Sequence, residues 1–190
     1  MNFICKGRFN EKAMEEVINL KQIKLLGGIG SILSFLVFIP HLGLWIRLAG
    51  FILISIAIFN LEKETKSRGI FAKFIFGSLI SVAIVLLVFV FLLLGIGILA
   101  FMRAKGTALI IVVGGLLLVW LLFILGNYLI KKSYDGIAQI TKEKNFARAG
   151  SFYFLGAITS IILVGFVLNF VARILEILAF FSLPDELKRE

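Results

Sequence analysis

Histidine and cysteine are nearly absent from this chain of 190 residues, which holds one of each, His41 and Cys5. A lone cysteine cannot close an internal disulfide, and nothing near Cys5 has metal-ligand spacing. Because His and Cys are the main ligands of zinc and related metals, we expect no such metal site, and we expect no cofactor. The first 24 residues also lack the apolar stretch and cleavage site of a secretory signal peptide.

Charged residues are scarce as well, at 16%, whereas 61% of the residues are hydrophobic. A soluble domain is about 45–50% apolar and about 25% charged. Uncharged runs cover residues 25–46, 74–102, 106–130 and 149–172, and each exceeds the roughly 18 residues that indicate a membrane-spanning helix. The sequence therefore predicts an all-α, polytopic membrane protein. We expect its net charge of +9 to reflect cations at the cytoplasmic face, and we expect no nucleic-acid partner.

Breaks within the first and last apolar regions divide each of them into a hairpin. Pro40 and Gly43 interrupt the first region, and Gly165 and Asn169 lie near the centre of the last. The predicted spans are residues 24–40, 43–61, 70–102, 108–130, 150–167 and 169–183, within one transmembrane domain of residues 23–184. We expect residues 1–22 to be cytoplasmic or interfacial and residues 185–190 to form a cytoplasmic tail.

The distribution of Lys and Arg predicts the orientation in the cell membrane. With six spans, the N-terminal segment, the two linkers at 62–73 and 131–148 and the C-terminal tail share sixteen of the 20 cations. The opposite side holds the other four, which are Arg47, Arg103, Lys105 and Arg173. Cations concentrate on the cytoplasmic side of membrane proteins, so both termini are expected there. Outer hairpins that re-enter on the same face would give the same orientation.

The two outer hairpins look like copies of each other. The sequence LGGIGSIL at 26–33 matches LGAITSII at 155–162, and AIFNL at 57–61 matches AFFSL at 179–183. Both copies start from the predicted cytoplasmic face, so we expect a parallel repeat about an axis along the membrane normal. Such a duplication occurs in transporters, and it is also a simple way to build a bundle.

These motifs, with the basic linker that contains GIF and the later stretch FYFLGAITSIIL…AFFSLP, carry a resemblance. The chain resembles, from about residue 22 to 184, the domain of unknown function 996 family of prokaryotic, largely archaeal, integral membrane proteins. The resemblance implies a multi-span membrane protein. It implies no activity, catalytic residue or cofactor.

Small residues in the apolar helices indicate close helix packing. Gly27, Gly28, Gly30 and Ser31 form one patch, and its counterpart in the second copy contains Gly156 and Ser160. A phosphate-binding loop is the alternative for the first patch, but no strand precedes it and no GK[ST] follows. Small-xxx-small spacing lets helix backbones approach closely, so we expect the first and fifth spans to make the central contacts. Opening of the first span into a substrate site at its glycines is the second alternative.

The linkers are expected to lie at the lipid headgroups. In residues 133–148, Tyr134, Ile137 and Ile140 recur near helical spacing and basic residues follow them. This pattern predicts an amphipathic segment with its cations near anionic lipid. Residues 10–24 suggest the same arrangement, and a docking surface for a cytoplasmic partner is the alternative for both segments.

Glu176 is the one acidic residue within the predicted spans. Because an unpaired charge in the bilayer is costly, we expect an ion pair, with Arg173 at i−3 as the favoured partner and Arg47 as the other candidate. The pair would fix the rotation of its helix. Alternatively, Glu176 would be a proton or cation site of a transporter.

A single embedded acid cannot supply a catalytic constellation, so the sequence predicts a protein that is not an enzyme. The favoured function is a helix bundle that acts by association, as a homo-oligomer or as an accessory subunit of a membrane complex. The alternatives are a small transporter or channel that uses Arg173 and Glu176, and a protein that shapes membranes through short amphipathic hairpins.

Overall fold

The computed structural model of the protein describes residues 17–36, 43–101, 107–162 and 164–188. The helices are α1 (Lys21–Phe35), α2 (Gly43–Thr65), α3 (Ile70–Phe101), α4 (Thr107–Thr141), α5 (Lys144–Ile158) and α6 (Val164–Phe181), with a short 3₁₀ turn, η2 (Thr159–Ile161). Two three-residue strands, β1 (Val17–Asn19) and β2 (Glu186–Lys188), complete the described chain. The all-α prediction is confirmed.

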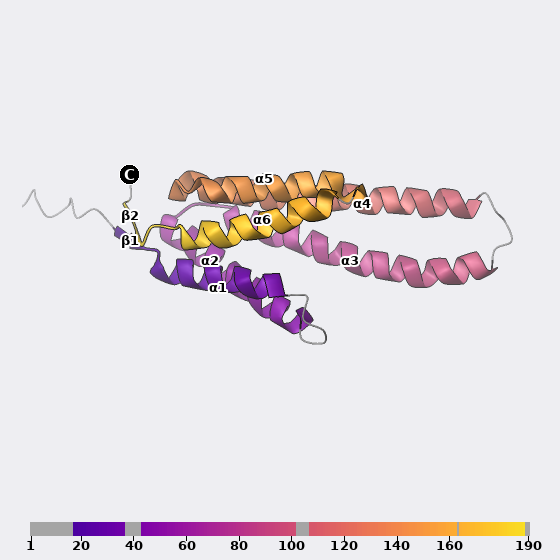
Figure 1. Ribbon diagram of the computed structural model, residues 1–190, viewed down its shortest axis with the longest axis horizontal. Helices are drawn as coiled ribbons and strands as arrows, with labels where there is room; N and C mark the ends of the chain where they lie inside the picture. The colour runs from indigo at the N-terminus through magenta and orange to yellow at the C-terminus, as the bar shows by residue number, and fades with distance from the viewer. Residues whose placement is uncertain (1–16, 37–42, 102–106, 163, 189–190) are drawn as a thin grey trace, which may run out of the picture.

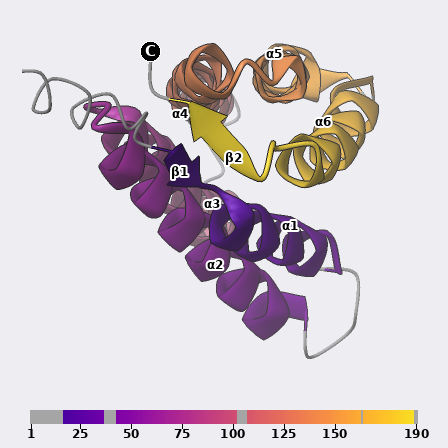
Figure 2. The same cartoon turned by 90° about the vertical axis from the view of Figure 1, so that its left-hand side faces the viewer.

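The helices form three antiparallel hairpins, α1–α2, α3–α4 and α5–α6. Each helix packs against the next one in the chain, and α6 packs back against α1, so the bundle is a closed ring in sequence order (Figures 1 and 2). The contact between α2 and α3 is the smallest in this ring. Since consecutive elements joined by short connections tend to become neighbours, the order of the ring follows largely from the chain itself.

The hairpins differ greatly in length. Helix α3 has 32 residues and α4 has 35, whereas α1 and α5 have 15 each, or about 22 Å at helical rise. The α3–α4 hairpin therefore projects beyond the other helices (Figure 1). Of the described helices, α2, α3, α4 and α6 contain segments long and apolar enough to cross a membrane. Helices α1 and α5 are shorter than a hydrocarbon core of about 30 Å.

The third hairpin turns earlier than the predicted boundary between residues 167 and 169. Helix α5 ends at Ile158, and η2 separates it from α6. Thr159 Oγ1 donates to the Leu155 carbonyl and Ser160 Oγ to the Ala157 carbonyl, so these hydroxyls satisfy carbonyls where the helix ends. Asn169 lies inside α6 and donates to the Gly165 carbonyl. The predicted boundary was therefore wrong, because Asn169 is accommodated within a helix.

The predicted headgroup segment at 133–148 is also different in the structure. Helix α4 continues through it to Thr141, and α5 begins at Lys144. Tyr134 and Ile137 are fully buried among the neighbouring helices. Their helical spacing reflects packing against protein, which looks the same in sequence as packing against lipid. Lys144 and Arg148 remain exposed.

The two described ends of the chain meet at one end of the bundle. Strand β1 pairs antiparallel with β2, with Ile18 opposite Leu187. Lys24 Nζ lies 3.1 Å from an oxygen of Asp185, and the Leu20 amide donates to the Asp185 carbonyl. The prediction for residues 1–22 included no strand, and residues 1–16 lie outside the described chain. Because they pair, the two ends of the described chain must lie at the same end of the helix bundle.

Aromatic side chains fill the centre of the ring at this end. Tyr134 of α4 lies in contact with three other rings: Phe74 at 6.2 Å, Phe146 at 5.9 Å and Tyr153 at 6.2 Å between centroids. Phe146 also meets Phe180 edge-on at 5.0 Å. Helices α3, α4, α5 and α6 therefore share one aromatic core, and the charged cluster described next lies beside it.

Candidate functional site

Helix α6 places Arg173 and Glu176 on one face, because residues three apart are neighbours on a helix. Arg173 Nη1 lies 3.0 Å from Glu176 Oε2. The Glu176 side chain is 1% exposed, whereas that of Arg173 is 31% exposed. The carboxylate is thus inside the bundle, and the Arg173 side chain is only partly buried.

Two further helices donate hydrogen bonds to the same carboxylate. Tyr153 of α5 donates its phenolic hydrogen to Glu176 Oε2. Ser31 of α1 donates to Oε1 at 3.3 Å. The Arg173 guanidinium also lies over the Tyr153 ring, 5.3 Å from its centroid, where the ring face attracts a cation. We call Ser31, Tyr153, Arg173 and Glu176 the Glu176 cluster.

Glycines allow α1 to bring Ser31 into this cluster. A Cβ atom on Gly30 would lie 2.8 Å from the carbonyl oxygen of Gly50 on α2, and one on Gly27 would lie 2.1 Å from Phe180 of α6. Both distances are too short for a real side chain. The absence of side chains at Gly27 and Gly30 therefore permits the close approach of α1 to both neighbours.

The other small residues predicted to pack also lie at helix contacts. A Cβ on Gly28 would meet the ring of Phe181 at 2.7 Å, and one on Gly156 would meet the Asn169 amide at 2.7 Å. Ser160 lies in the turn η2, where its backbone packs against Gly165. Helix α6, which lies between α1 and α5 (Figure 2), is a partner of both patches, and Gly30 of the first patch packs against α2. The expected central contact between the first and fifth spans is therefore replaced by contacts of each with α6.

Arg47 does not join the ion pair. It is an exposed residue of α2, and the structure records no ion pair between it and a described acid. Tyr153 was not predicted from the sequence, and Ser31 was predicted only to pack. A tyrosine in an apolar helix has a hydroxyl that needs a partner when buried, and this was the one available signal for Tyr153.

The Glu176 cluster holds a carboxylate that is paired with a cation and accepts hydrogen bonds from neighbouring helices. One cation balances its charge, and hydroxyl groups from two other helices donate hydrogen bonds to it. Within the described parts of the chain, every buried side-chain nitrogen and oxygen has a partner. The same residues contain no group of three or more His, Cys, Asp and Glu side chains arranged to hold a metal ion. The arrangement clamps α1, α5 and α6 together.

Comparison with known proteins places the chain among relatives of unknown function. The sequence pattern of a family described as "Protein of unknown function (DUF996)" matches residues 46–174. The chain is also similar to "Uncharacterized protein MJ1644" of Methanocaldococcus jannaschii, with 34% identity over 175 residues, which cover 91% of this chain and 98% of that protein. No solved structure matches it. Both the family match and this relative show that the chain belongs to the DUF996 family.

Proposed function

We propose that this protein is a non-enzymatic helix bundle of the cell membrane that acts by association. It binds either a second copy of itself or another subunit of a membrane complex. The observation that carries this proposal is the environment of Gly114 on α4. Among the described residues, a Cβ atom on Gly114 would meet no atom within 4 Å, although the residue lies in an apolar helix long enough to cross a membrane.

A small residue within an apolar membrane helix typically permits another helix to approach closely. Gly30, Gly50, Gly77 and Gly126 follow this rule, because a Cβ on any of them would lie within about 3 Å of an atom of a neighbouring helix. Gly114 has space instead. The space continues along α4 past side chains that follow at helical spacing and are half exposed: Leu118, Leu121 and Leu125. This face of α4 is suited to a helix from another chain.

The Glu176 cluster supports the same function in a structural role. A buried carboxylate whose partners come from three helices fixes the rotation of each helix, since any other rotation would separate it from the hydroxyl groups of α1 and α5. A bundle held in one arrangement presents a constant outer surface, and specific association requires such a surface. The parallel duplication of the outer hairpins is compatible with this role and remains a prediction.

The topology that we propose has both termini in the cytoplasm. Strands β1 and β2, the α2–α3 connection and the α4–α5 connection all lie at one end of the bundle (Figure 1). Exposed cations cluster there, including Lys63, Lys66, Arg68 and Lys144, as expected of the cytoplasmic side. The α3–α4 hairpin crosses the bilayer fully. The shorter outer hairpins enter and return on the cytoplasmic side, either by crossing or by turning within the membrane.

Native mass spectrometry after gentle extraction from the native membrane tests the proposal. We expect a homo-oligomer or a stoichiometric complex with another membrane protein. Gly114→Phe should reduce the associated fraction at least tenfold, whereas Leu116→Phe adds bulk to a different lipid-exposed part of α4 and should leave it unchanged. A monomer without partners, or an association insensitive to Gly114→Phe, would rule out this surface.

A small transporter or channel is the second candidate. It is favoured by the difference in exposure within one ion pair, because the Arg173 side chain is 31% exposed while that of Glu176 is 1% exposed. A proton or cation could then be exchanged at Glu176 when the pair opens. Ion or proton flux into proteoliposomes is the test. Glu176→Gln should abolish the flux, and an unaffected rate would remove Glu176 from the mechanism.

A further inference from the structure

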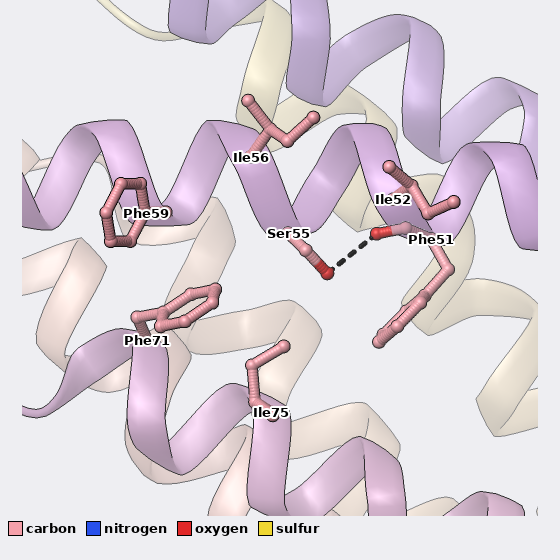
Figure 3. A pocket seen from close by; sticks show the side chains of 7 residues that line it. All are labelled: Phe51, Ile52, Ser55, Ile56, Phe59, Phe71 and Ile75. Atoms are coloured by element: carbon pink, nitrogen blue, oxygen red, sulfur yellow. Dashed lines mark hydrogen bonds between the residues drawn. The ribbon is translucent and has the colours of Figure 1, made fainter.

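The ring of helices has one weak contact, between α2 and α3, and an apolar groove lies there. The groove has a volume of about 290 Å³. It is lined mainly by Ile52, Ser55, Ile56 and Phe59 of α2 and by Phe71 and Ile75 of α3 (Figure 3). From this groove and the charges beside it we infer a binding site for one membrane lipid, with an apolar tail between α2 and α3 and an anionic headgroup at the basic connection that joins them.

Aromatic pairs define two sides of the groove. Phe51 stacks on Phe74 at 6.0 Å between centroids, and Phe74 is buried in the core of the bundle, so this pair separates the groove from the core. Phe59 and Phe71 meet edge-on at 5.3 Å on the side of the α2–α3 connection (Figure 3). Because Phe59 is half exposed, a lipid tail reaches that connection over the outer face of this pair. The lining residues of α2 extend from Phe51 to Phe59, about two turns of the helix, so the groove follows α2 as an extended hydrocarbon chain requires.

No side chain in the lining has a polar atom that needs a water molecule as its hydrogen-bond partner. Ser55 is the one polar side chain in it, and its hydroxyl donates to the Phe51 carbonyl at 2.8 Å (Figure 3). Ile52 and Phe59 are about half exposed, at 52% and 50%, so the groove is open toward the surroundings of the bundle. In a membrane those surroundings are lipid tails, and a tail fills a groove of this kind without leaving a void or an unsatisfied donor.

Cations lie where the headgroup of such a lipid would be. Lys63 follows Phe59 by four residues and so continues the same face of α2. Lys66 and Arg68 lie in the turn between the helices, and Lys73 is in the first turns of α3; all four side chains are exposed. The headgroup of a lipid whose tail lies between the helices would be level with this turn, because the turn joins the ends of the two helices that form the groove.

Acidic residues in the same region reduce this positive charge only in part. The Glu62 carboxylate accepts hydrogen bonds from the Gly69 amide at 3.0 Å and from the Phe71 amide, so it caps the start of α3. Glu64 is exposed. Four cations and two acids therefore occupy residues 62–73. One of the two acids, Glu62, is bound to backbone amides.

Selectivity should come from the headgroup and not from the tail. A lipid tail leaves surroundings as apolar as the groove, so its transfer gains little. Each Lys or Arg near the surface strengthens the binding of anionic lipid about fivefold. A zwitterionic lipid would fit the same groove with little of this gain. We therefore assign the site to an anionic phospholipid.

Photocrosslinking tests this inference independently of oligomeric state. The full-length protein is placed in phosphatidylcholine vesicles that contain a trace of phosphatidylglycerol with a diazirine in one tail, and crosslinked residues are mapped by mass spectrometry. We expect crosslinks concentrated in residues 51–59 and 71–75. A phosphatidylcholine probe with the same tail should crosslink there at least about tenfold less, as expected for two or more cations.

Ser55→Trp fills the groove and should reduce these crosslinks at least fivefold, whereas Leu79→Trp, on an exposed part of α3, should not. Replacement of Lys63, Lys66 and Arg68 by Gln leaves the groove intact and should abolish the preference for phosphatidylglycerol. This second variant carries the test if Ser55→Trp does not fold. Crosslinks spread evenly over Phe76, Leu79 and the groove would overturn the site, as would equal labelling by both probes or chain-to-chain crosslinks at the groove in place of lipid.

Discussion

Tyr153 and Arg173 lie on different helices, yet both donate a hydrogen bond to the same atom, Oε2 of Glu176. The guanidinium also lies over the phenol ring, 5.3 Å from its centroid. The position of each group is thus fixed by the other two. In a low-dielectric interior, hydrogen-bonded groups of this kind strengthen one another. The loss of either charged group would leave the other without its partner.

Removal of Arg173 alone should therefore lower the free energy of unfolding more than removal of both charged side chains. Arg173→Met leaves Glu176 buried without a cation and should lower the free energy of unfolding by about 3 kcal/mol. This loss is at the lower end of the range for a broken buried ion pair, because Arg173 is partly exposed. The double variant Arg173→Met/Glu176→Met removes both charges and should regain most of this loss. Thermal unfolding in one detergent measures all three proteins. Additive losses in the double variant would show that the two side chains are not coupled.

The Tyr153 hydroxyl should contribute through its charged acceptor. Tyr153→Phe keeps the ring packing and removes one donor, at an expected cost of about 1.5–3 kcal/mol. Tyr128→Phe is the matched control, because Tyr128 is 40% exposed and should change stability by less than about 0.5 kcal/mol. Equal unfolding temperatures for the two variants would mean that the hydrogen bond from Tyr153 to Glu176 does not stabilise the protein.

Gly77 of α3 should tolerate no side chain. A Cβ there would lie 2.6 Å from the carbonyl oxygen of Gly126 on α4, and backbone cannot move aside as a side chain can. Gly77→Ala should destabilise the protein by about 1–3 kcal/mol through overpacking.

Gly136→Ala is the comparison for Gly77→Ala. Its nearest neighbours are side-chain atoms of Ile70 at 3.2 and 3.3 Å, which can shift by a few tenths of an ångström. The better helix propensity of Ala should offset that cost. Unfolding in detergent compares the two variants, and an equal loss in both would indicate that α3 and α4 are not in close contact at Gly77.

Opposite ends of the α3–α4 hairpin should react from opposite sides of the membrane. With Cys5 replaced by Ser, a cysteine at Ser67 should react with an impermeant maleimide only from the cytoplasmic side. A cysteine at Lys105, which lies outside the described residues, should react only from the opposite side. Reaction of both cysteines from one side would contradict the crossing of the bilayer by α3 and α4. Spheroplasts and inverted vesicles supply the two orientations.

Much of the fold could be read from composition and chain order. Long uncharged runs require helices in a membrane because every backbone group must be satisfied within its own segment, and α3 begins and ends within about a residue of the predicted span at 70–102. The division into three hairpins was also correct, although the last turn was placed too late. The turn lies at Thr159–Ile161, whereas the prediction placed it at residue 168, between the breaks indicated by Gly165 and Asn169.

The sequence by itself determined that the protein is a helical bundle and that Glu176 needs a cation three residues away, since helix geometry alone brings such side chains together. The tertiary structure alone decided that Tyr153 and Ser31 complete the cluster and that α6 separates α1 from α5. It also decided that α2 and α3 leave a groove. These contacts join residues far apart in the chain. The same apolar side chains suit a surface that faces lipid and one that faces protein, so only the tertiary packing shows which of the two a helix face contacts.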